Sequence, residues 1–128
     1  MSDRPNVVWL VSDQQVHANR PIFEAAAESF PLRFRMAREG IQFNRAYTVL
    51  PICTPARASM LTGLYPHRHG ITENDGRFGG REGLSRQDAL LSHYLTGAGY
   101  RCAYFGKWHL SNQASAQDFG FEGFSLPG

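Results

Sequence analysis

Three short apolar segments alternate with helix-forming segments along the chain. Residues 6–11 are continuously apolar and β-branched, residues 41–48 begin with an apolar-polar alternation, and residues 100–105 are again apolar and aromatic. Strands that alternate with helices favour right-handed crossovers and a largely parallel sheet. The sequence therefore predicts an α/β fold with these three segments as strands.

Two helical regions are expected around these strands. Residues 21–39 contain helix formers and are interrupted at Pro31, which allows either two short helices or one kinked helix. Residues 85–96 begin with a Ser-x-x-Asp pattern that resembles a capping box. Residues 64–83 have no period and are expected to form a long loop, and residues 111–128 carry no clear pattern of either kind.

Composition limits the classes of protein to which the chain can belong. With 128 residues, 42% of them hydrophobic, it has material for one domain or for part of a larger one. A net charge of +2 does not indicate a nucleic-acid or membrane partner. Cys53 and Cys102 form neither a disulfide framework nor a zinc-finger spacing. The apolar run at residues 7–11 is too short for a signal segment or a membrane span, so we expect a cytoplasmic protein.

Polar residues follow each predicted strand. In a parallel sheet, ligands bind beyond the carboxyl ends of the strands, so these residues are expected to share one rim. In chain order the candidates are Asp13 and Gln14, then Cys53 and Arg57, then Lys107 and His109.

Residues 51–63 predict a turn that leads into a helix. Thr54 suits the N-cap, Pro55 the first helical position and Gly63 the C-terminal end. Cys53 then lies at a helix N-terminus, where backbone N–H groups and the helix dipole favour an anion, and Arg57 adds a permanent positive charge. The segment therefore predicts a pocket for an oxyanion.

The other candidates supply complementary chemistry. Asp13 and Gln14 offer hard oxygen ligands of the kind that Ca²⁺ or Mg²⁺ prefers. Lys107, the only lysine in the chain, and His109 are two residues apart. On an extended segment they would point to the same side and provide one fixed cation and one titratable proton carrier.

Three segments resemble the signatures of the sulfatase family. The stretch Pro-Ile-Cys-Thr-Pro-Ala-Arg-Ala-Ser-Met-Leu-Thr-Gly at residues 51–63 is similar to its CxPxR signature. Residues 4–14 resemble the family's opening strand with its metal-binding acidic pair, and Gly-Lys-Trp-His at residues 106–109 resembles its second signature. The resemblance implies that residues 1–128 are the N-terminal part of a catalytic domain, an alkaline-phosphatase-like α/β sandwich with a mostly parallel sheet.

The resemblance also implies a mechanism. Cys53 would be oxidised to formylglycine, and one hydroxyl of its hydrate would attack the sulfur of a small-molecule sulfate ester. The resulting hemiester would collapse to the aldehyde and release sulfate. Asp13, Gln14 and the modified Cys53 would bind a divalent metal, Ca²⁺ first and Mg²⁺ or Mn²⁺ as alternatives.

The same resemblance assigns roles to the remaining residues. Arg57 would steady the nucleophile, Lys107 would bind the sulfate, and His109 would hydrogen-bond the diol as a candidate base. Two departures stand out. The family usually has two acidic residues where this chain has Asp13 and Gln14, although a glutamine carbonyl still coordinates calcium. Family members are also several times longer, so a later segment or a second chain would bring further metal ligands, a leaving-group acid and the substrate pocket.

Alternatives remain open at this point. The same kind of site also suits a phosphonate or phosphate ester hydrolase, and the chain could be an inactive remnant or a binding module that associates. Asp13 could simply cap a turn, and Lys107 and His109 could belong to a solvated loop. The remaining candidates are expected to be structural: Cys102 in the core, His67 and His69 in loop packing, and Arg33, Arg35 and Arg38 on a solvated helix face.

Overall fold

The computed structural model describes residues 4–14 and 31–126. The chain divides into two compact units, Met1–Ala46 and Tyr47–Gly128, and each is described by itself. The predictions for residues 21–30 lie outside the described residues. That residues 1–128 form part of a single catalytic domain stays a prediction.

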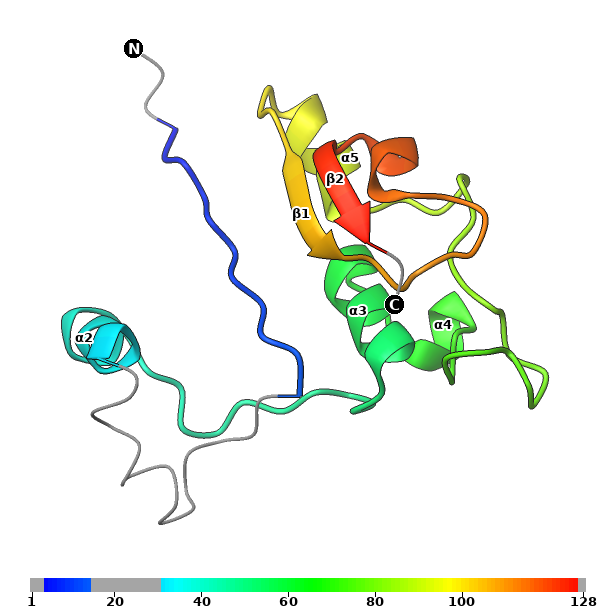
Figure 1. The fold of residues 1–128 in the computed structure, drawn as a ribbon, viewed down its shortest axis with the longest axis horizontal. Helices are drawn as coiled ribbons and strands as arrows, with labels where there is room; N and C mark the ends of the chain where they lie inside the picture. The colour runs from blue at the N-terminus through cyan, green and yellow to red at the C-terminus, as the bar shows by residue number, and fades with distance from the viewer. Residues whose placement is uncertain (1–3, 15–30, 127–128) are drawn as a thin grey trace. The chain divides into compact units, whose positions relative to one another are not determined.

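The first unit contains one described helix, α2 (Pro31–Glu39), drawn in cyan in Figure 1. Its end matches the sequence, because the Gly40 N–H donates to the Met36 carbonyl at 2.9 Å. None of its residues is buried, and Arg35 pairs with Glu39 one turn later at 3.0 Å. The solvated basic face expected for this helix is confirmed.

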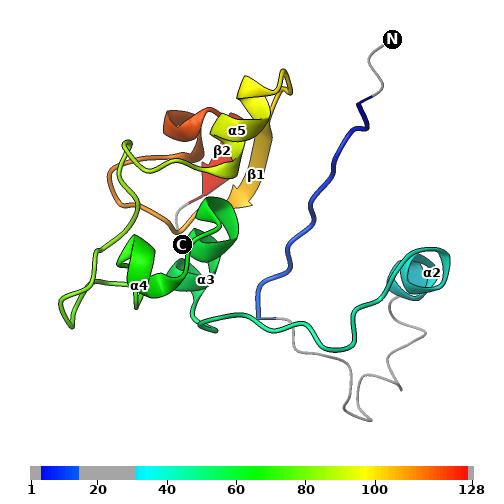
Figure 2. The ribbon, with the colours of Figure 1, turned by 180° about the vertical axis from the view of Figure 1, so that it is seen from behind.

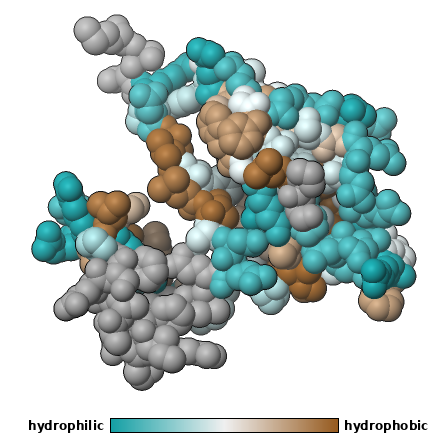
Figure 3. Space-filling view, viewed as in Figure 1, coloured by the Kyte–Doolittle hydropathy of each residue, from teal (hydrophilic) through white to brown (hydrophobic). Residues whose placement is uncertain are grey.

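The two strands predicted in the first unit are not formed in the structure. Residues 6–11 and 41–48 lie outside any strand, and Val8 and Leu10 are 81% and 79% exposed. The run 7–11 is the extended blue trace of Figure 1 and a row of apolar atoms in Figure 3. The composition is that of a buried strand, but a strand requires a hydrogen-bonded neighbour, and no described segment provides one. These two strand predictions are therefore wrong for the structure described.

The second unit begins with α3 (Cys53–Thr62), which carries the cysteine signature. It ends at Gly63 as predicted, where φ is 70° and the N–H donates to the Ser59 carbonyl at 2.9 Å. The short helix α4 (Pro66–His69) follows inside the segment that was expected to be a loop. Its own local signals are Pro66 at its start and Gly70 at its end.

Helix α5 (Leu91–Gly97) begins later than the capping pattern at Ser85 indicates. The Ser85 N–H does donate to the Asp88 carboxylate at 2.7 Å, as in a capping box. The same carboxylate accepts from Arg81 at 2.6 Å, so Asp88 closes a turn that is fixed to the preceding loop. The pattern therefore predicts the side-chain bond correctly and the start of the helix wrongly.

Two parallel strands, β1 (Ala103–Lys107) and β2 (Glu122–Leu126), form the described sheet. The 3₁₀ helix η2 (Ala116–Phe119) lies in the connection between them. Figures 1 and 2 show both strands pointing their carboxyl ends toward α3, with α5 on one face of the sheet. The parallel pairing agrees with the α/β class. β1 lies slightly later than the predicted strand, and β2 falls where no element was expected.

Two aromatic side chains of this sheet are largely exposed. The rings of Phe105 and Phe124 meet edge to face with their centroids 5.5 Å apart and remain 68% and 56% exposed. Gly123 lies beside them with a φ of 95°, and a Cβ at this position would come within 2.6 Å of the Tyr104 carbonyl oxygen. Glycine is therefore required where the Phe105 ring crosses the neighbouring strand.

The core of the second unit is built around Trp108, which is 3% exposed. Its ring centroid lies 5.4 Å from that of Phe119 and 5.2 Å from that of Tyr104, which it meets edge-on. Its Nε1–H donates to the Ala114 carbonyl at 2.9 Å. The other buried apolar residues are Ala58, Leu61, Ile71, Leu84, Leu90, Leu110, Ala114, Ala116 and Phe119. This core joins α3 to the segment that follows β1.

Candidate functional site

Cys53 is the first residue of α3 and is half-buried. The N-cap is Ile52, which has extended backbone angles and no capping side chain, so the prediction of Thr54 as N-cap is wrong. Thr54 lies inside the helix and is 1% exposed. Its backbone N–H is instead bound by the side-chain Oδ1 of Asn74 at 3.0 Å. The capping group therefore comes from a distant loop, and sequence analysis missed it because no local pattern marks it.

Arg57 joins this helix to the end of β1. Its Nη1 donates to the Lys107 carbonyl oxygen at 2.9 Å and to the Tyr104 hydroxyl at 3.4 Å. Arg57 comes four residues after Cys53, so both project from the same face of α3. The cysteine face of the helix is thus turned toward the strand end that carries Lys107.

Tyr104 supports the Arg57 guanidinium from inside the sheet. Its hydroxyl donates a short hydrogen bond to the same Lys107 carbonyl and accepts from Arg57, so both donors converge on one oxygen. Burial raises the pKa of the Tyr104 hydroxyl, with Arg57 acting against that shift. The phenol is therefore neutral and available as a donor at neutral pH.

Lys107 and His109 occupy the end of β1 and the turn after it. Lys107 is the last residue of the strand, and the next N–H, that of Trp108, donates to the Leu126 carbonyl at 2.7 Å. His109 has a φ of 50°, so the extended geometry that would place the two side chains on one side is not what the structure shows. Its backbone is held between two buried neighbours, Trp108 and Leu110. This left-handed conformation costs a non-glycine residue about 1–3 kcal/mol.

A cleft brings His109 and Asn74 together. Its lining residues come from the loop after α4, the turn after β1 and the η2 region: Asn74, Asp75, Trp108, His109, Ser111, Asn112, Gln113, Ala114, Ser115, Asp118, Ser125 and Leu126. Because Asn74 also caps Thr54, this cleft adjoins the N-terminal end of α3. The second unit therefore joins the helix of Cys53 and Arg57 to the strand end at Lys107, and His109 lines the adjoining cleft.

Asp13 and Gln14 belong to the first unit, where both are exposed. The structure does not define their position relative to Cys53, so the predicted common rim stays a prediction for these two residues. Gln14 has a φ of 55°. Among the described residues, Gln14 and His109 are the two non-glycine residues with positive φ, and both are site candidates from the sequence. Backbone strain of this kind gathers at functional sites.

Comparison with known proteins decides the family. The Sulfatase family model matches residues 5–126. The chain belongs to the sulfatase family. It is similar to the extracellular sulfatase SULF-1 homolog of Drosophila melanogaster, with 36% identity over 107 residues, covering 82% of this chain and 9% of that protein. It is also similar to the uncharacterized sulfatase YidJ of Escherichia coli strain K12, with 34% identity over 113 residues, covering 84% and 20%.

A crystal structure supports the same assignment. The yidJ protein of Bacteroides fragilis, described as a sulfatase, has a TM-score of 0.57 and 35% identity, covering 63% of this chain and 18% of that chain. The alkaline-phosphatase-like α/β class expected for this sulfatase is confirmed by that likeness. The chain spans a fifth or less of the length of each of these three relatives.

The side chains predicted to bind a metal are of a chemical type that suits a hard cation. Asp13 and Gln14 provide a carboxylate and an amide oxygen, which are ligand types of Ca²⁺ and Mg²⁺. Calcium takes about six to eight oxygen ligands, so these two residues are a partial set. Within residues 4–14 and 31–126, no group of three or more His, Cys, Asp and Glu side chains could hold a metal ion. Further ligands would have to come from elsewhere.

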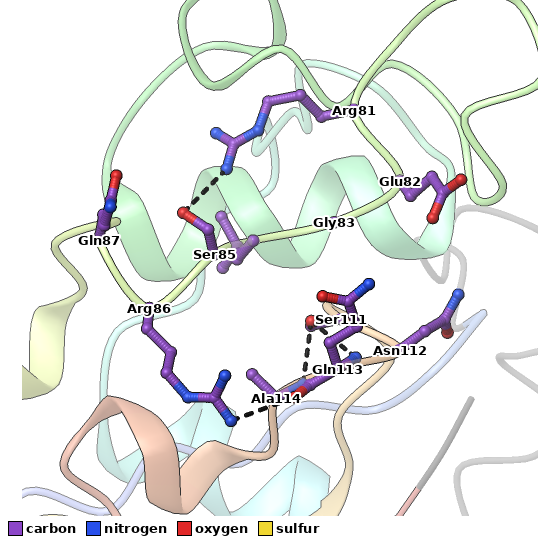
Figure 4. A pocket seen from close by; sticks show the side chains of 11 residues that line it. Arg81, Glu82, Gly83, Ser85, Arg86, Gln87, Ser111, Asn112, Gln113 and Ala114 are labelled. Atoms are coloured by element: carbon purple, nitrogen blue, oxygen red, sulfur yellow. Dashed lines mark hydrogen bonds between the residues drawn. The ribbon is translucent and has the colours of Figure 1, made fainter.

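A second cleft of the unit contains none of the predicted site residues. It is lined by residues 81–87 and 111–114, and Figure 4 shows two arginines at its edge. Arg81 is paired with Asp88 at 2.6 Å and Arg86 with Asp118 at 3.0 Å. Burial would raise the pKa of the Asp88 carboxyl, but the Arg81 and Ser85 hydrogen bonds outweigh it and lower this pKa. Both cations are thus already neutralised, which disfavours this cleft as the sulfate site.

His69 and Cys102 are structural, although Cys102 is only partly in the core. His69 is 3% exposed; its Nδ1 accepts the Ile71 N–H at 3.1 Å, so the neutral ring carries its proton on Nε2 and donates to Ser59 Oγ at 3.0 Å. Burial lowers the pKa of His69, with Arg81 acting in the same direction. Cys102 is half-buried against the Ser92 carbonyl. None of the described helices is long and apolar enough to span a bilayer.

Proposed function

We propose that this sulfatase hydrolyses sulfate esters of small molecules, with the side chain at position 53 as its nucleophile. The observation that carries the proposal is the hydrogen bond from Arg57 to the Lys107 carbonyl at 2.9 Å. It joins the two segments that carry the family signatures, so the cysteine face of α3 and the end of β1 form one site.

Each residue of the second unit has a role in this proposal. Formylglycine, made from Cys53 by a separate oxidising enzyme, supplies a geminal diol as the nucleophile. The positive end of α3 favours the negative charge of the sulfate group. Lys107 adds a cation at the strand end, and His109 holds or accepts the proton of the attacking hydroxyl in the adjoining cleft.

Asp13 and Gln14 would hold a divalent cation, with Ca²⁺ as the first candidate and Mg²⁺ or Mn²⁺ as alternatives. Bound there, such an ion supplies polarisation of the sulfate oxygens. Residue 53, once modified, would be a further ligand. The leaving-group acid and the remaining ligands would come from residues outside this set, either in the same polypeptide or in a second chain.

The test measures turnover of an aryl sulfate by the full-length protein expressed together with a cysteine-oxidising maturation enzyme. Cys53→Ala should remove turnover by several orders of magnitude, because no nucleophile remains. Cys102→Ala is the matched control, since Cys102 lies against the Ser92 carbonyl and away from the α3 N-terminus. The mass of the peptide that contains residue 53 reports the modification directly.

Two results would overturn this proposal. The first is wild-type turnover by Cys53→Ala, which would exclude position 53 as the nucleophile. The second is faster turnover of an aryl phosphonate or phosphate than of the matched aryl sulfate, which would make the protein a phosphorus ester hydrolase.

A further inference from the structure

Asn74 reaches across from the loop after α4 to the helix that carries the cysteine. Its Oδ1 accepts the Thr54 N–H at 3.0 Å, a bond between residues 20 apart in the sequence. Thr54 is 1% exposed and Asn74 is half-buried, so the donor side of the bond is shielded from water. A shielded hydrogen bond is costly to lose, because the donor is then buried without a partner.

Most N–H groups at the start of α3 have identified hydrogen-bond acceptors. The Ile52 N–H donates to the Leu50 carbonyl at 2.9 Å, and the Ala56 N–H begins the regular helical bonds by donating to Ile52 at 2.9 Å. Pro55 has no N–H, and Asn74 takes that of Thr54. Among the described residues, these bonds leave the N–H of Cys53 as the one open donor of the first turn.

Asn74 also lines the cleft that contains His109. The same side chain therefore touches the backbone immediately after Cys53 and borders the space in which a substrate would lie. Neither the sequence pattern nor the family signature marks this residue, because its contact with α3 is made through the fold.

We propose that Asn74 is a positioning residue for the nucleophile at position 53. By holding the Thr54 N–H it fixes the peptide plane between residues 53 and 54, and with it the Cα of residue 53 from which the nucleophilic side chain projects. The inference rests on the proposed sulfate ester hydrolysis. It predicts that loss of the Asn74 acceptor lowers the rate of the chemical step more than it weakens substrate binding.

The first measurement is hydrogen exchange of the Thr54 amide by NMR in the full chain, which does not depend on activity. Asn74→Ala should raise the Thr54 exchange rate by up to about tenfold, since one hydrogen bond is lost. Asn74→Asp keeps an acceptor oxygen at the same position and should restore the protection. Unchanged exchange in Asn74→Ala would overturn the inference.

The second measurement is kcat and KM of the mature full-length enzyme on an aryl sulfate. Asn74→Ala should lower kcat by about tenfold and leave KM within about twofold. Glu73→Ala is the matched control, because Glu73 binds the Phe78 N–H within the same loop at 2.6 Å and does not bond to α3. If loop disorder were the cause, both variants would lose kcat.

The outcomes separate the two proposals. If Cys53→Ala is inactive while Asn74→Ala keeps full kcat, the positioning role fails and the proposed function stands. If Cys53→Ala keeps full turnover, the proposed function itself fails. Should Asn74→Ala not fold, Asn74→Asp decides: normal kcat with a protected Thr54 amide supports the inference, and lost kcat with a protected amide overturns it.

Discussion

Residues 6–11 and residues 103–106 are both largely apolar, and only the second segment has a partner strand within the described part of the chain. Each leads into site candidates, Asp13 and Gln14 in one case, Lys107 and His109 in the other. The later segment pairs with β2 in parallel and connects to a core in which Trp108 is 3% exposed. The earlier segment has no strand neighbour among the described residues, and its Trp9 is 51% exposed.

The comparison shows that strand composition alone does not produce a strand. Backbone hydrogen bonds and buried area both come from a neighbouring segment, and here that neighbour is Glu122–Leu126. It also separates the candidate site residues into two groups. Those of the second unit are held by Arg57 and the core, whereas Asp13 and Gln14 belong to the first unit.

The largest expected difference is between the losses of unfolding free energy when each of the two tryptophans is replaced. Trp108→Ala should lower the free energy of unfolding by about 3–5 kcal/mol, because it leaves a cavity and frees the Ala114 carbonyl. Trp9→Ala should change it by less than about 0.5 kcal/mol, since the side chain is half exposed. Urea denaturation followed by circular dichroism measures both. Equal losses would mean that residues 6–11 are as firmly packed as β1.

A smaller effect is expected where α3 meets β1. Arg57→Ala should cost about 1.5–3 kcal/mol in unfolding free energy, because it removes a charged hydrogen bond to the Lys107 carbonyl. Arg35→Ala is the control in the first unit, where an exposed pair with Glu39 contributes about 0.3–0.5 kcal/mol. The same denaturation experiment applies. An Arg57 variant as stable as the Arg35 variant would show that the α3–β1 link carries no stability.

The pH dependence of stability should also arise from a residue of the second unit. The folded-state pKa of His69 is lowered from 6.5 by burial first and by Arg81 next, so the unfolded chain binds the proton more readily. Stability should therefore fall as the pH decreases below 6.5 and level off below the folded-state pKa. His69→Gln should flatten this dependence, while exposed His67→Gln should keep it. Thermal unfolding between about pH 8 and pH 5 avoids titrating most carboxylates. An unchanged slope in His69→Gln would contradict this assignment.

The smallest change in stability is expected at Asp13. Asp13→Asn should alter the unfolding free energy by less than about 0.5 kcal/mol, because the residue is exposed. The calcium affinity of the Asp13→Asn protein, measured by titration calorimetry on the full-length chain, should be about tenfold or more below that of the wild type. Glu39→Gln removes another exposed carboxylate of the same unit, which is paired with Arg35, and should bind calcium normally. Equal affinities for both variants would remove Asp13 from the metal site.

Local signals explain which elements the sequence could predict. Helix α3 was predicted because Pro55 and Gly63 mark its two ends within the segment itself. Helix α4 carries the same pair of signals, Pro66 and Gly70, and could have been recognised from them. β2 could not, because its apolar-polar alternation is limited to Phe124, Ser125 and Leu126, and its position follows from pairing with β1.

The site divides in the same way. Cys53, Arg57, Lys107 and His109 were predicted from motifs. In the structure Arg57 bonds to the Lys107 carbonyl and His109 lines a cleft, while the predicted roles of these residues stay predictions. The Asn74 cap and the Arg57 bond to the Lys107 carbonyl were not predicted. The first bond joins residues that are 20 apart in the sequence, and the second joins residues that are 50 apart. Side-chain roles set by such distant contacts require the fold.

Gly123 has a consequence for sequence variation. Any side chain there would meet the Tyr104 carbonyl at 2.6 Å and the Phe105 ring at 2.9 Å. In a saturation mutagenesis library selected for folded protein, codon 123 should therefore retain glycine alone, while the exposed flanking codons 122 and 124 admit many amino acids. This sharp minimum in the number of tolerated amino acids would mark, from sequence data alone, the position at which the Phe105 ring lies over β2.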